Sequence, residues 1–154
     1  MRRMRPLEPG LRLLAFAVVG FGFITACAMR GEPLPPTAFA EVEVSSEREA
    51  VPSHEPIHFT LSLHNRGSDS LLLRFPTSQR YDLQIVDESG TSRWRWSDGR
   101  SFAQVLEEEQ LDPGETRVWR VTFEGVLSPG RYTVEGMVVA REGPLRSESE
   151  FTVH

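Results

Sequence analysis

The chain contains no lysine and only one cysteine, Cys27, among its 154 residues. A single cysteine excludes an internal disulfide and a cysteine-rich zinc site. The 17 basic residues are all arginine. The chain also has 22 acidic residues, so its formal net charge is −5. Four arginines and one acid lie within the first 26 residues, so the remainder carries 13 basic and 21 acidic residues and a net charge of −8. This balance argues against a nucleic-acid partner.

The chain also lacks a long apolar run. Its main apolar stretch, residues 11–24, is shorter than the roughly 20 residues that a membrane-spanning helix needs. Arg2, Arg3 and Arg5 precede this stretch and small residues follow it, which is the pattern of a signal peptide over residues 1–26. The end of the stretch, Ile-Thr-Ala-Cys at residues 24–27, resembles the bacterial lipobox. That resemblance implies cleavage just before Cys27 and attachment of a diacylglycerol to it.

We therefore expect an exported protein that is anchored in the bacterial cell envelope through lipid on Cys27. Each buried acyl CH₂ contributes about 0.8 kcal/mol, and more than one chain holds a protein firmly on a membrane. Ala28 rather than aspartate follows the cysteine, which favours the outer membrane if the organism has two. Residues 27–37 are polar and contain Pro33, Pro35 and Pro36, so we expect an extended tether there.

Residues 38–154 show short alternating patterns and no long helical one. In residues 58–65, Phe59, Leu61 and Leu63 fall on one face and polar residues on the other, which predicts a half-buried strand. Comparable strands are expected at residues 39–45, 71–75, 81–87, 92–97, 117–123, 132–138 and 147–153. Seven or eight short strands between regular turns predict an all-β fold, an immunoglobulin-like antiparallel β-sandwich. A Pro-Gly turn just before Tyr132 is typical of the tyrosine corner of such sandwiches.

One segment, residues 102–111, is ambiguous. Phe102, Val105 and Leu106 have helical spacing, so this segment is either a single helical turn or an irregular crossing between the sheets. The acidic run at residues 107–109 is interpreted as a solvated face or loop rather than a cation site, because it lacks the alternating oxygen ligands of a calcium loop.

No constellation of residues indicates catalysis. The chain has no Gly-x-Ser-x-Gly motif. His58 and His64 share one strand face but are six residues apart. A strand rises about 3.3 Å per residue, so the two rings are too far apart to share a metal ion. We expect no enzyme, no cofactor and no metal site.

Trp94 and Trp96 are two residues apart on a predicted strand and therefore share a face. If that face points inward, both rings belong to the core. If one ring points outward, it offers a platform for a peptide or a sugar ring, because tryptophan combines apolar area with a hydrogen-bond donor. Both alternatives remain open at this point.

The most specific pattern surrounds these tryptophans. Residues 94–104 read Trp-x-Trp-Ser-x-Gly-x-x-Phe-x-Gln, residues 78–83 read Ser-Gln-x-Tyr-Asp-Leu, and Pro-Gly turns follow at residues 113–114 and 129–130. Together these motifs resemble the BsuPI-type intracellular proteinase inhibitor domain over roughly residues 42–139. The resemblance implies an immunoglobulin-like sandwich that inhibits a serine protease. Because this chain carries an export signal, its protease would be an envelope protease rather than an intracellular one.

An inhibitor needs an exposed, rigid loop, and residues 76–80 fit that description. Pro76 limits flexibility and Arg80 offers a long side chain, so Thr77, Ser78, Gln79 and Arg80 are candidate partner-binding residues beside Trp94 and Trp96. The alternative is a plain interstrand loop whose Ser78 and Gln79 satisfy backbone groups. Residues 98–101 form the second candidate loop.

The functional expectation is a membrane-anchored envelope lipoprotein that inhibits a serine protease by protein–protein binding. The alternative function is a non-inhibitory binding or assembly module with another envelope protein or a glycan as its ligand. The sequence predicts no particular oligomeric state.

Overall fold

A computed structural model describes residue 35 and residues 37–143 and 145–154. The expected signal peptide, Cys27 and most of the tether lie outside these described residues. The strands are β1 (Ala40–Ser46), β2 (Ala50–Val51), β3 (Ile57–Asn65), β4 (Leu71–Phe75), β5 (Tyr81–Asp87), β6 (Ser92–Arg95), β7 (Glu107–Leu111), β8 (Thr116–Phe123), β9 (Gly130–Val138) and β10 (Leu145–Val153). No helix in the described ranges is long and apolar enough to cross a membrane.

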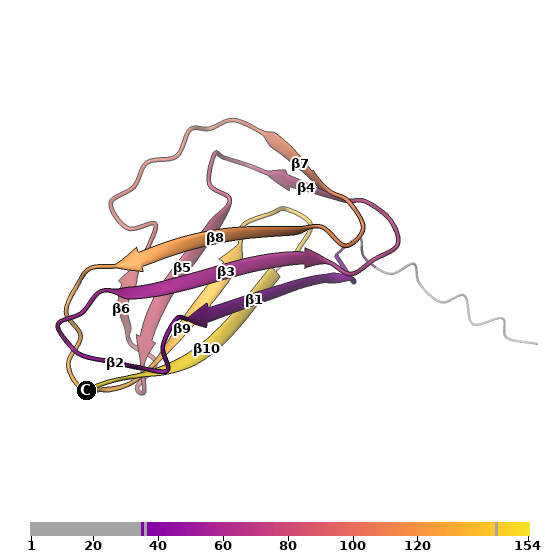
Figure 1. Ribbon diagram of the computed structural model, residues 1–154. Helices are drawn as coiled ribbons and strands as arrows, with labels where there is room; N and C mark the ends of the chain where they lie inside the picture. The colour runs from indigo at the N-terminus through magenta and orange to yellow at the C-terminus, as the bar shows by residue number, and fades with distance from the viewer. Residues whose placement is uncertain (1–34, 36, 144) are drawn as a thin grey trace, which may run out of the picture. The chain divides into compact units, whose positions relative to one another are not determined.

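The strands form two main sheets and one small one. One main sheet has the order β1-β3-β8 and the other β2-β10-β9-β5-β6, while β4 and β7 form a separate two-stranded sheet. In Figure 1 the β1-β3-β8 layer runs in front of β9, β10 and β5, and β4 and β7 lie above both layers. Every pairing is antiparallel except the short contact between β10 and β2. The predicted all-β immunoglobulin-like sandwich is thereby confirmed.

Strict alternation along the strands builds the core between the two main sheets. In β3 every second residue from Ile57 is buried, including Phe59, Leu61 and Leu63. Burying one such side chain contributes about 1.5–3 kcal/mol. Phe59 meets Phe151 of the opposite sheet edge to face, with ring centroids 5.5 Å apart. The alternation of period two therefore determines which face of each strand joins the core.

The two main sheets approach each other closely at Gly136 of β9. A Cβ atom added at Gly136 would lie 2.6 Å from Leu61 Cδ1 and 2.9 Å from Val44 Cβ. Both separations are shorter than real carbon contacts, so any larger residue at Gly136 would push the two sheets apart.

The predicted tyrosine corner is present at the start of β9. The Tyr132 hydroxyl donates to the Ser128 carbonyl oxygen at 2.8 Å, four residues upstream. The Tyr132 ring is buried and stacks on Phe151 at 5.7 Å. This arrangement ties the turn after β8 to the core, as in other immunoglobulin-like sandwiches.

The structure resolves the ambiguous segment at residues 102–111 in favour of extended chain. The helical alternative was wrong, because residues 107–111 form β7 and pair with β4, with Leu111 opposite Leu71. Leu111 is fully buried, and this burial is available only to an extended chain in that register. The acidic run is therefore part of a strand rather than a loop.

Strand β2 was not predicted either. It has only two residues, too few to show any alternation, and it is held by pairing with the end of β10. With β2 and β7 included, the described part of the chain has ten strands rather than seven or eight.

Candidate protein-binding loops

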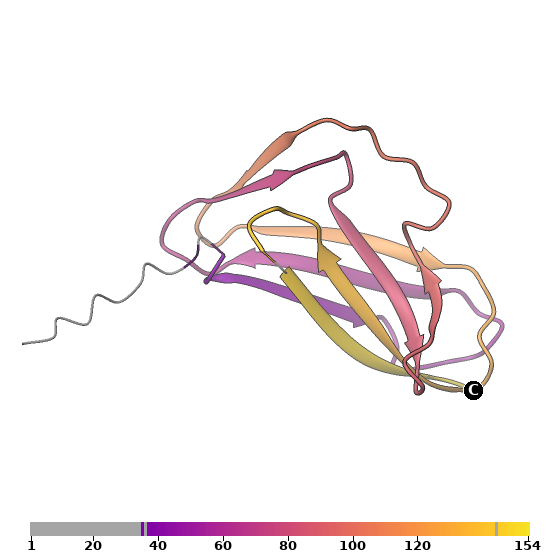
Figure 2. The same cartoon turned by 180° about the vertical axis from the view of Figure 1, so that it is seen from behind.

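Two loops lie side by side at one end of the sandwich. The support loop, residues 76–80, connects β4 to β5, and the crossing loop, residues 96–106, connects β6 to β7. Because β4 pairs with β7 and β5 pairs with β6, both loops pass from the small sheet to the main sheet at the same place. Figures 1 and 2 show the crossing loop as an outer arc that rises from the end of β6 to β7.

The two loops are joined by a reciprocal pair of hydrogen bonds. The Ser78 amide donates to the Ala103 carbonyl oxygen at 2.9 Å, and the Ala103 amide donates to Ser78 Oγ at 2.9 Å. Ser78 therefore holds the middle of the crossing loop, although neither loop has regular secondary structure there.

Arg80 joins the loops at a second point. Its guanidinium pairs with the Glu107 carboxylate at the start of β7, donates to the Thr77 carbonyl oxygen at 3.2 Å and lies 4.5 Å from the centroid of the Phe75 ring. The side chain is only 22% exposed. The structure thus turns the long side chain of Arg80 onto the body of the domain.

Thr77 and Gln79 stabilise the support loop from within. The Gln79 amide donates to Thr77 Oγ1 at 3.2 Å, and Gln79 Nε2 donates to the Tyr81 carbonyl oxygen at 3.0 Å. These contacts are those expected of an interstrand loop whose side chains satisfy backbone groups. A direct role of residues 77–80 in binding a partner stays a prediction.

Trp96 opens the crossing loop inside a cluster of aromatic rings. Its ring centroid lies 4.4 Å from that of Tyr81 and 5.8 Å from that of Phe102, and the Arg100 guanidinium lies 4.4 Å from it. Arg100 Nε also donates to the Trp96 carbonyl oxygen at 2.7 Å. The half-buried ring is thus occupied by neighbours of the same domain.

Trp94 also faces the opposite sheet. Its ring meets Phe123 of β8 edge to face at 5.3 Å, and the Tyr81 ring lies 5.5 Å from Trp119 of the same strand. Both tryptophans pack against the core and are partly buried. Of the two alternatives, the geometry therefore favours the inward one, and the predicted role of Trp94 and Trp96 in binding is not tested by it.

Burial in this cluster also affects Tyr81. Desolvation of its hydroxyl raises the pKa of Tyr81 above the usual value of about 10, while the positive charge of Arg100 acts weakly in the opposite direction. Tyr81 is consequently neutral throughout the physiological range and serves as an aromatic wall of the site.

Asp82 is a supporting residue that sequence reasoning missed. It is 5% exposed, and Oδ1 accepts from the amides of Leu83 at 3.0 Å and Ser97 at 3.1 Å. Oδ2 accepts from the Ser97 hydroxyl at 2.8 Å. Asp82 thus fixes the first turn of the crossing loop to β5. The signal that could have identified Asp82 was its position in the family motifs, where it follows Tyr81 as Ser97 follows Trp96.

The far half of the crossing loop is exposed and apolar. Val105 is 44% exposed and Leu106 is 57% exposed. The Val105 amide donates to the Ala103 carbonyl oxygen at 3.0 Å, which places Gln104 at the apex of a three-residue turn. Sequence reasoning selected residues 98–101 as the second candidate loop, and the exposed apolar side chains lie just beyond them.

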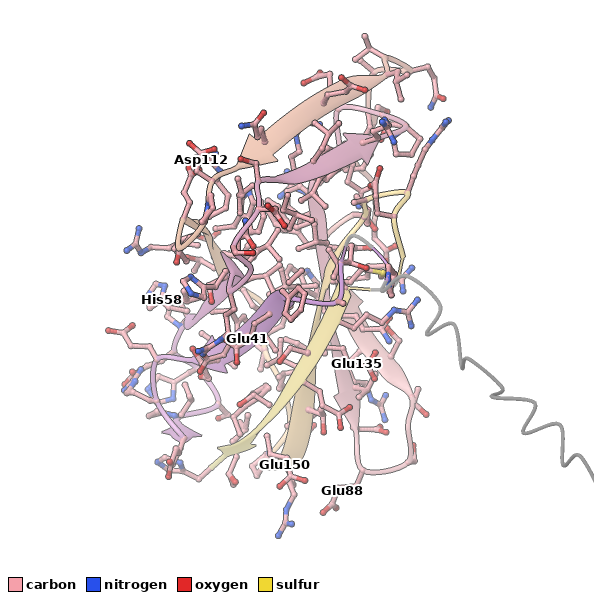
Figure 3. The ribbon with its side chains drawn as sticks, turned by 90° about the vertical axis from the view of Figure 1, so that its right-hand side faces the viewer. Glu41, His58, Glu88, Asp112, Glu135 and Glu150 are labelled. Atoms are coloured by element: carbon pink, nitrogen blue, oxygen red, sulfur yellow. The ribbon has the colours of Figure 1, made fainter. Side chains whose placement is uncertain are left out.

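The ionisable groups do not converge on a metal-binding arrangement. Within the described ranges no group of three or more His, Cys, Asp or Glu side chains is placed to hold a metal ion. His58 and His64 form hydrogen bonds with Thr122 at 3.0 Å and Thr116 at 2.7 Å. Figure 3 shows Glu135 and Glu150 on the β9–β10 layer, away from His58 on the β3 side.

Comparison with known proteins identifies the domain. The model of the BsuPI family, described as intracellular proteinase inhibitor, matches residues 42–143. The chain belongs to the BsuPI family. The matched range begins within β1, ends after β9 and includes both loops, so the motifs that carry the resemblance lie in the site described above.

Solved structures share the fold at low identity. The C-terminal domain of Wzt is 15% identical with a TM-score of 0.50, and the match covers 75% of this chain and 74% of that one. The CARDB domain of the PF1109 protein from Pyrococcus furiosus is 16% identical with a TM-score of 0.45, covering 75% and 87%. A β-glucosidase from Erythrobacter marinus is 14% identical with a TM-score of 0.44, covering 75% and 15%. At these identities the likeness concerns the fold alone.

The chain spans only 15% of the β-glucosidase, so it resembles one part of that enzyme. The comparison with curated proteins finds no match.

Proposed function

We propose that this BsuPI domain inhibits a serine protease by protein–protein binding, with the support loop and the crossing loop as its contact surface. The observation that carries the proposal is the reciprocal hydrogen bonding between Ser78 and Ala103, which holds an exposed loop in one conformation. A loop that is already ordered loses less conformational entropy on binding than a flexible one. Membership of the BsuPI family indicates a protease as the partner.

The inhibitor family implies a binding role rather than an enzymatic one. The arrangement of the described polar groups agrees with that role. The buried polar side chains are Asn65 and Asp82, and both are engaged in hydrogen bonds to the backbone. Their contacts are those of structural residues that hold turns in place.

We further propose that the domain acts at the bacterial cell envelope, anchored through lipid on Cys27. The support for this comes from the sequence of residues 1–27, in which an arginine-rich start and an apolar stretch lead to Ile-Thr-Ala-Cys. A proline-rich tether between Cys27 and β1 would let the domain reach a protease at the membrane surface or in the adjoining compartment.

The test is a titration of residues 28–154, produced without the lipidated cysteine, against a panel of subtilisin-like proteases. Activity on a small chromogenic substrate should fall linearly with added domain and reach its minimum near one equivalent, with the domain remaining intact. A folded, uncleaved domain that leaves every protease active at large excess would overturn the inhibitor proposal.

The alternative function, a non-inhibitory binding or assembly module for an envelope protein or a glycan, is the conclusion that this negative result would support. A polar groove of about 380 Å³ on the outer face of the larger sheet is lined by side chains that include Gln84, Arg95 and Glu135. The lining of this groove contains no aromatic ring on which a sugar could stack. For the alternative function, a protein ligand is therefore favoured over a glycan at this groove.

A further inference from the structure

Residues 101–106 are the longest part of the crossing loop without charge. The residues on either side are charged: Asp98 and Arg100 precede the segment, and the acidic run of β7 follows it. Within the segment, Val105 and Leu106 are adjacent and both expose their aliphatic side chains. Single exposed apolar residues are normal on protein surfaces, whereas adjacent ones on an ordered loop point to a contact surface.

The chain is bonded to the support loop on both sides of residues 104–106. Ala103 is bonded to Ser78 through its amide and its carbonyl group, and Glu107 is paired with Arg80. The Val105 amide is bonded to the Ala103 carbonyl oxygen. The chain between these points presents Gln104, Val105 and Leu106 to solvent.

The two acidic side chains that follow the segment are paired within the domain. Glu107 pairs with Arg80, and Glu108 pairs with Arg74 at 3.0 Å. Arg100 is placed over the Trp96 ring. What a partner meets at this point is consequently an aliphatic surface, and the complementary feature is a concave apolar pocket rather than a charged one.

Two other exposed apolar residues, Val126 and Leu72, do not form such a surface. Val126 is the most exposed, but its neighbour Leu127 is buried, so it stands alone in the turn after β8. Leu72 is 37% exposed and lies within a regular strand opposite the polar Gln110. Arg80, the long side chain of the support loop, is committed to Glu107.

We propose that residues 103–106 are the segment that enters the active-site cleft of the target protease, with Val105 and Leu106 as its principal contacts. The target is then a serine endoprotease whose substrate pocket accepts aliphatic side chains. This inference rests on the proposed inhibitory function and specifies which residues perform it and which class of protease they fit.

The test compares three variants of residues 28–154 against a protease that the wild-type domain inhibits. Leu106→Asp places a charge where the apolar pocket is expected, and the inhibition constant should rise about 30-fold or more, as for truncation of an interface hot spot. Leu72→Asp makes the same chemical change on the small sheet outside the loop and should change the constant less than threefold. Thermal melting of each variant confirms that it is folded.

Leu106→Arg supplies a second readout that loss of folding cannot imitate. It should weaken inhibition of proteases with an aliphatic pocket and improve inhibition of trypsin-like proteases, whose pocket is acidic. Wild-type inhibition that is unchanged by both Leu106 variants would overturn the inference and leave the proposed function standing. No inhibition of any protease by the wild-type domain would overturn both.

Discussion

At the scale of single residues, the crossing loop depends on one buried carboxylate, that of Asp82. Asp82 accepts three hydrogen bonds at the base of the crossing loop, two of them from Ser97. Removal of a buried acceptor costs more than the hydrogen bonds themselves, because donors are left without partners. Asp82 and Ser97 are therefore supporting residues for the loop rather than contacts for a partner.

Replacement of Asp82 by alanine should lower the free energy of unfolding by about 2–3 kcal/mol, since three donors lose their acceptor in a buried place. Urea denaturation followed by tryptophan fluorescence measures this loss. Asp98→Ala, an exposed acid at the tip of the same loop, is the matched control and should stay within about 0.5 kcal/mol of the wild type. Equal stability of the two variants would refute the role assigned to Asp82.

A second residue, Asp87, determines how the β5–β6 turn responds to acid. The Ser89 hydroxyl, 2.6 Å from Asp87 Oδ1, is the main cause that holds the pKa of Asp87 well below its usual value near 4. The Thr91 amide at 2.9 Å and Arg93 act in the same direction. The folded state thus favours the charged form of Asp87. The contribution of this carboxylate to the free energy of unfolding is therefore complete above pH 4 and is lost as the pH falls towards the lowered pKa.

Asp87→Asn should consequently be less sensitive to acid than the wild type. The stability difference between the two should be constant from pH 8 to pH 5 and should shrink between pH 4 and pH 2. Ser89→Ala, which removes the largest cause of the lowered pKa, should show part of the same change. A difference that does not vary with pH would contradict this interpretation of the turn.

At the scale of elements, the strands could be predicted and the loop contacts could not. Alternation in residues 57–65 identifies β3 because one face of that strand is buried along its whole length. Strand β7 was not predicted, because its three consecutive glutamates resemble a solvated loop. In the structure these glutamates form ion pairs with Arg74, Arg80 and Arg117. No local pattern reveals such long-range partners.

The contact between Ser78 and Ala103 illustrates the same limit. The two residues are 25 positions apart and meet only because two separate strand pairings bring their loops together. The sequence pattern selected Ser78 and Arg80 as candidate partner-binding residues, and that role stays a prediction. The structure adds that both residues contact the neighbouring loop or the strand that follows it, Ser78 through Ala103 and Arg80 through Glu107.

The support given by Ser78 can be measured directly in the free domain. Ser78→Ala removes the acceptor of the Ala103 amide, and a lost hydrogen bond of about 1 kcal/mol corresponds to roughly fivefold faster amide exchange at Ala103. Ser101→Ala changes an exposed serine of the same loop and should leave that exchange rate unaltered. If Ala103 already exchanges at the rate of an unprotected amide in the wild type, the crossing loop is not held as described.

At the scale of the whole molecule, the proposal joins a binding domain to a membrane anchor. The expected anchor lies at Cys27, ahead of the described residues, and the domain begins with β1 at Ala40. An envelope location restricts the target to proteases of that compartment, although the family name refers to an intracellular proteinase inhibitor. The proposed anchor and the proposed inhibitory surface lie in separate parts of the chain and can be tested separately.

Cys27→Ala should block lipid attachment, because the thiol that carries the diacylglycerol is absent. In a bacterial host that processes lipoproteins, the wild-type chain should sediment with membranes and incorporate radiolabelled palmitate, and the variant should do neither. Membrane association that survives the substitution without label would contradict the anchoring proposal.

The central claim, that the domain blocks a protease by occupying its active site, is tested most directly by labelling the catalytic serine. A small fluorophosphonate probe is added to an inhibited protease that has been preincubated with increasing amounts of residues 28–154. The account predicts that labelling falls in proportion to the added domain and is almost abolished near one equivalent, while Leu106→Asp protects poorly. Labelling at the full rate in the presence of bound domain would show that the active site is open, and would contradict the claim.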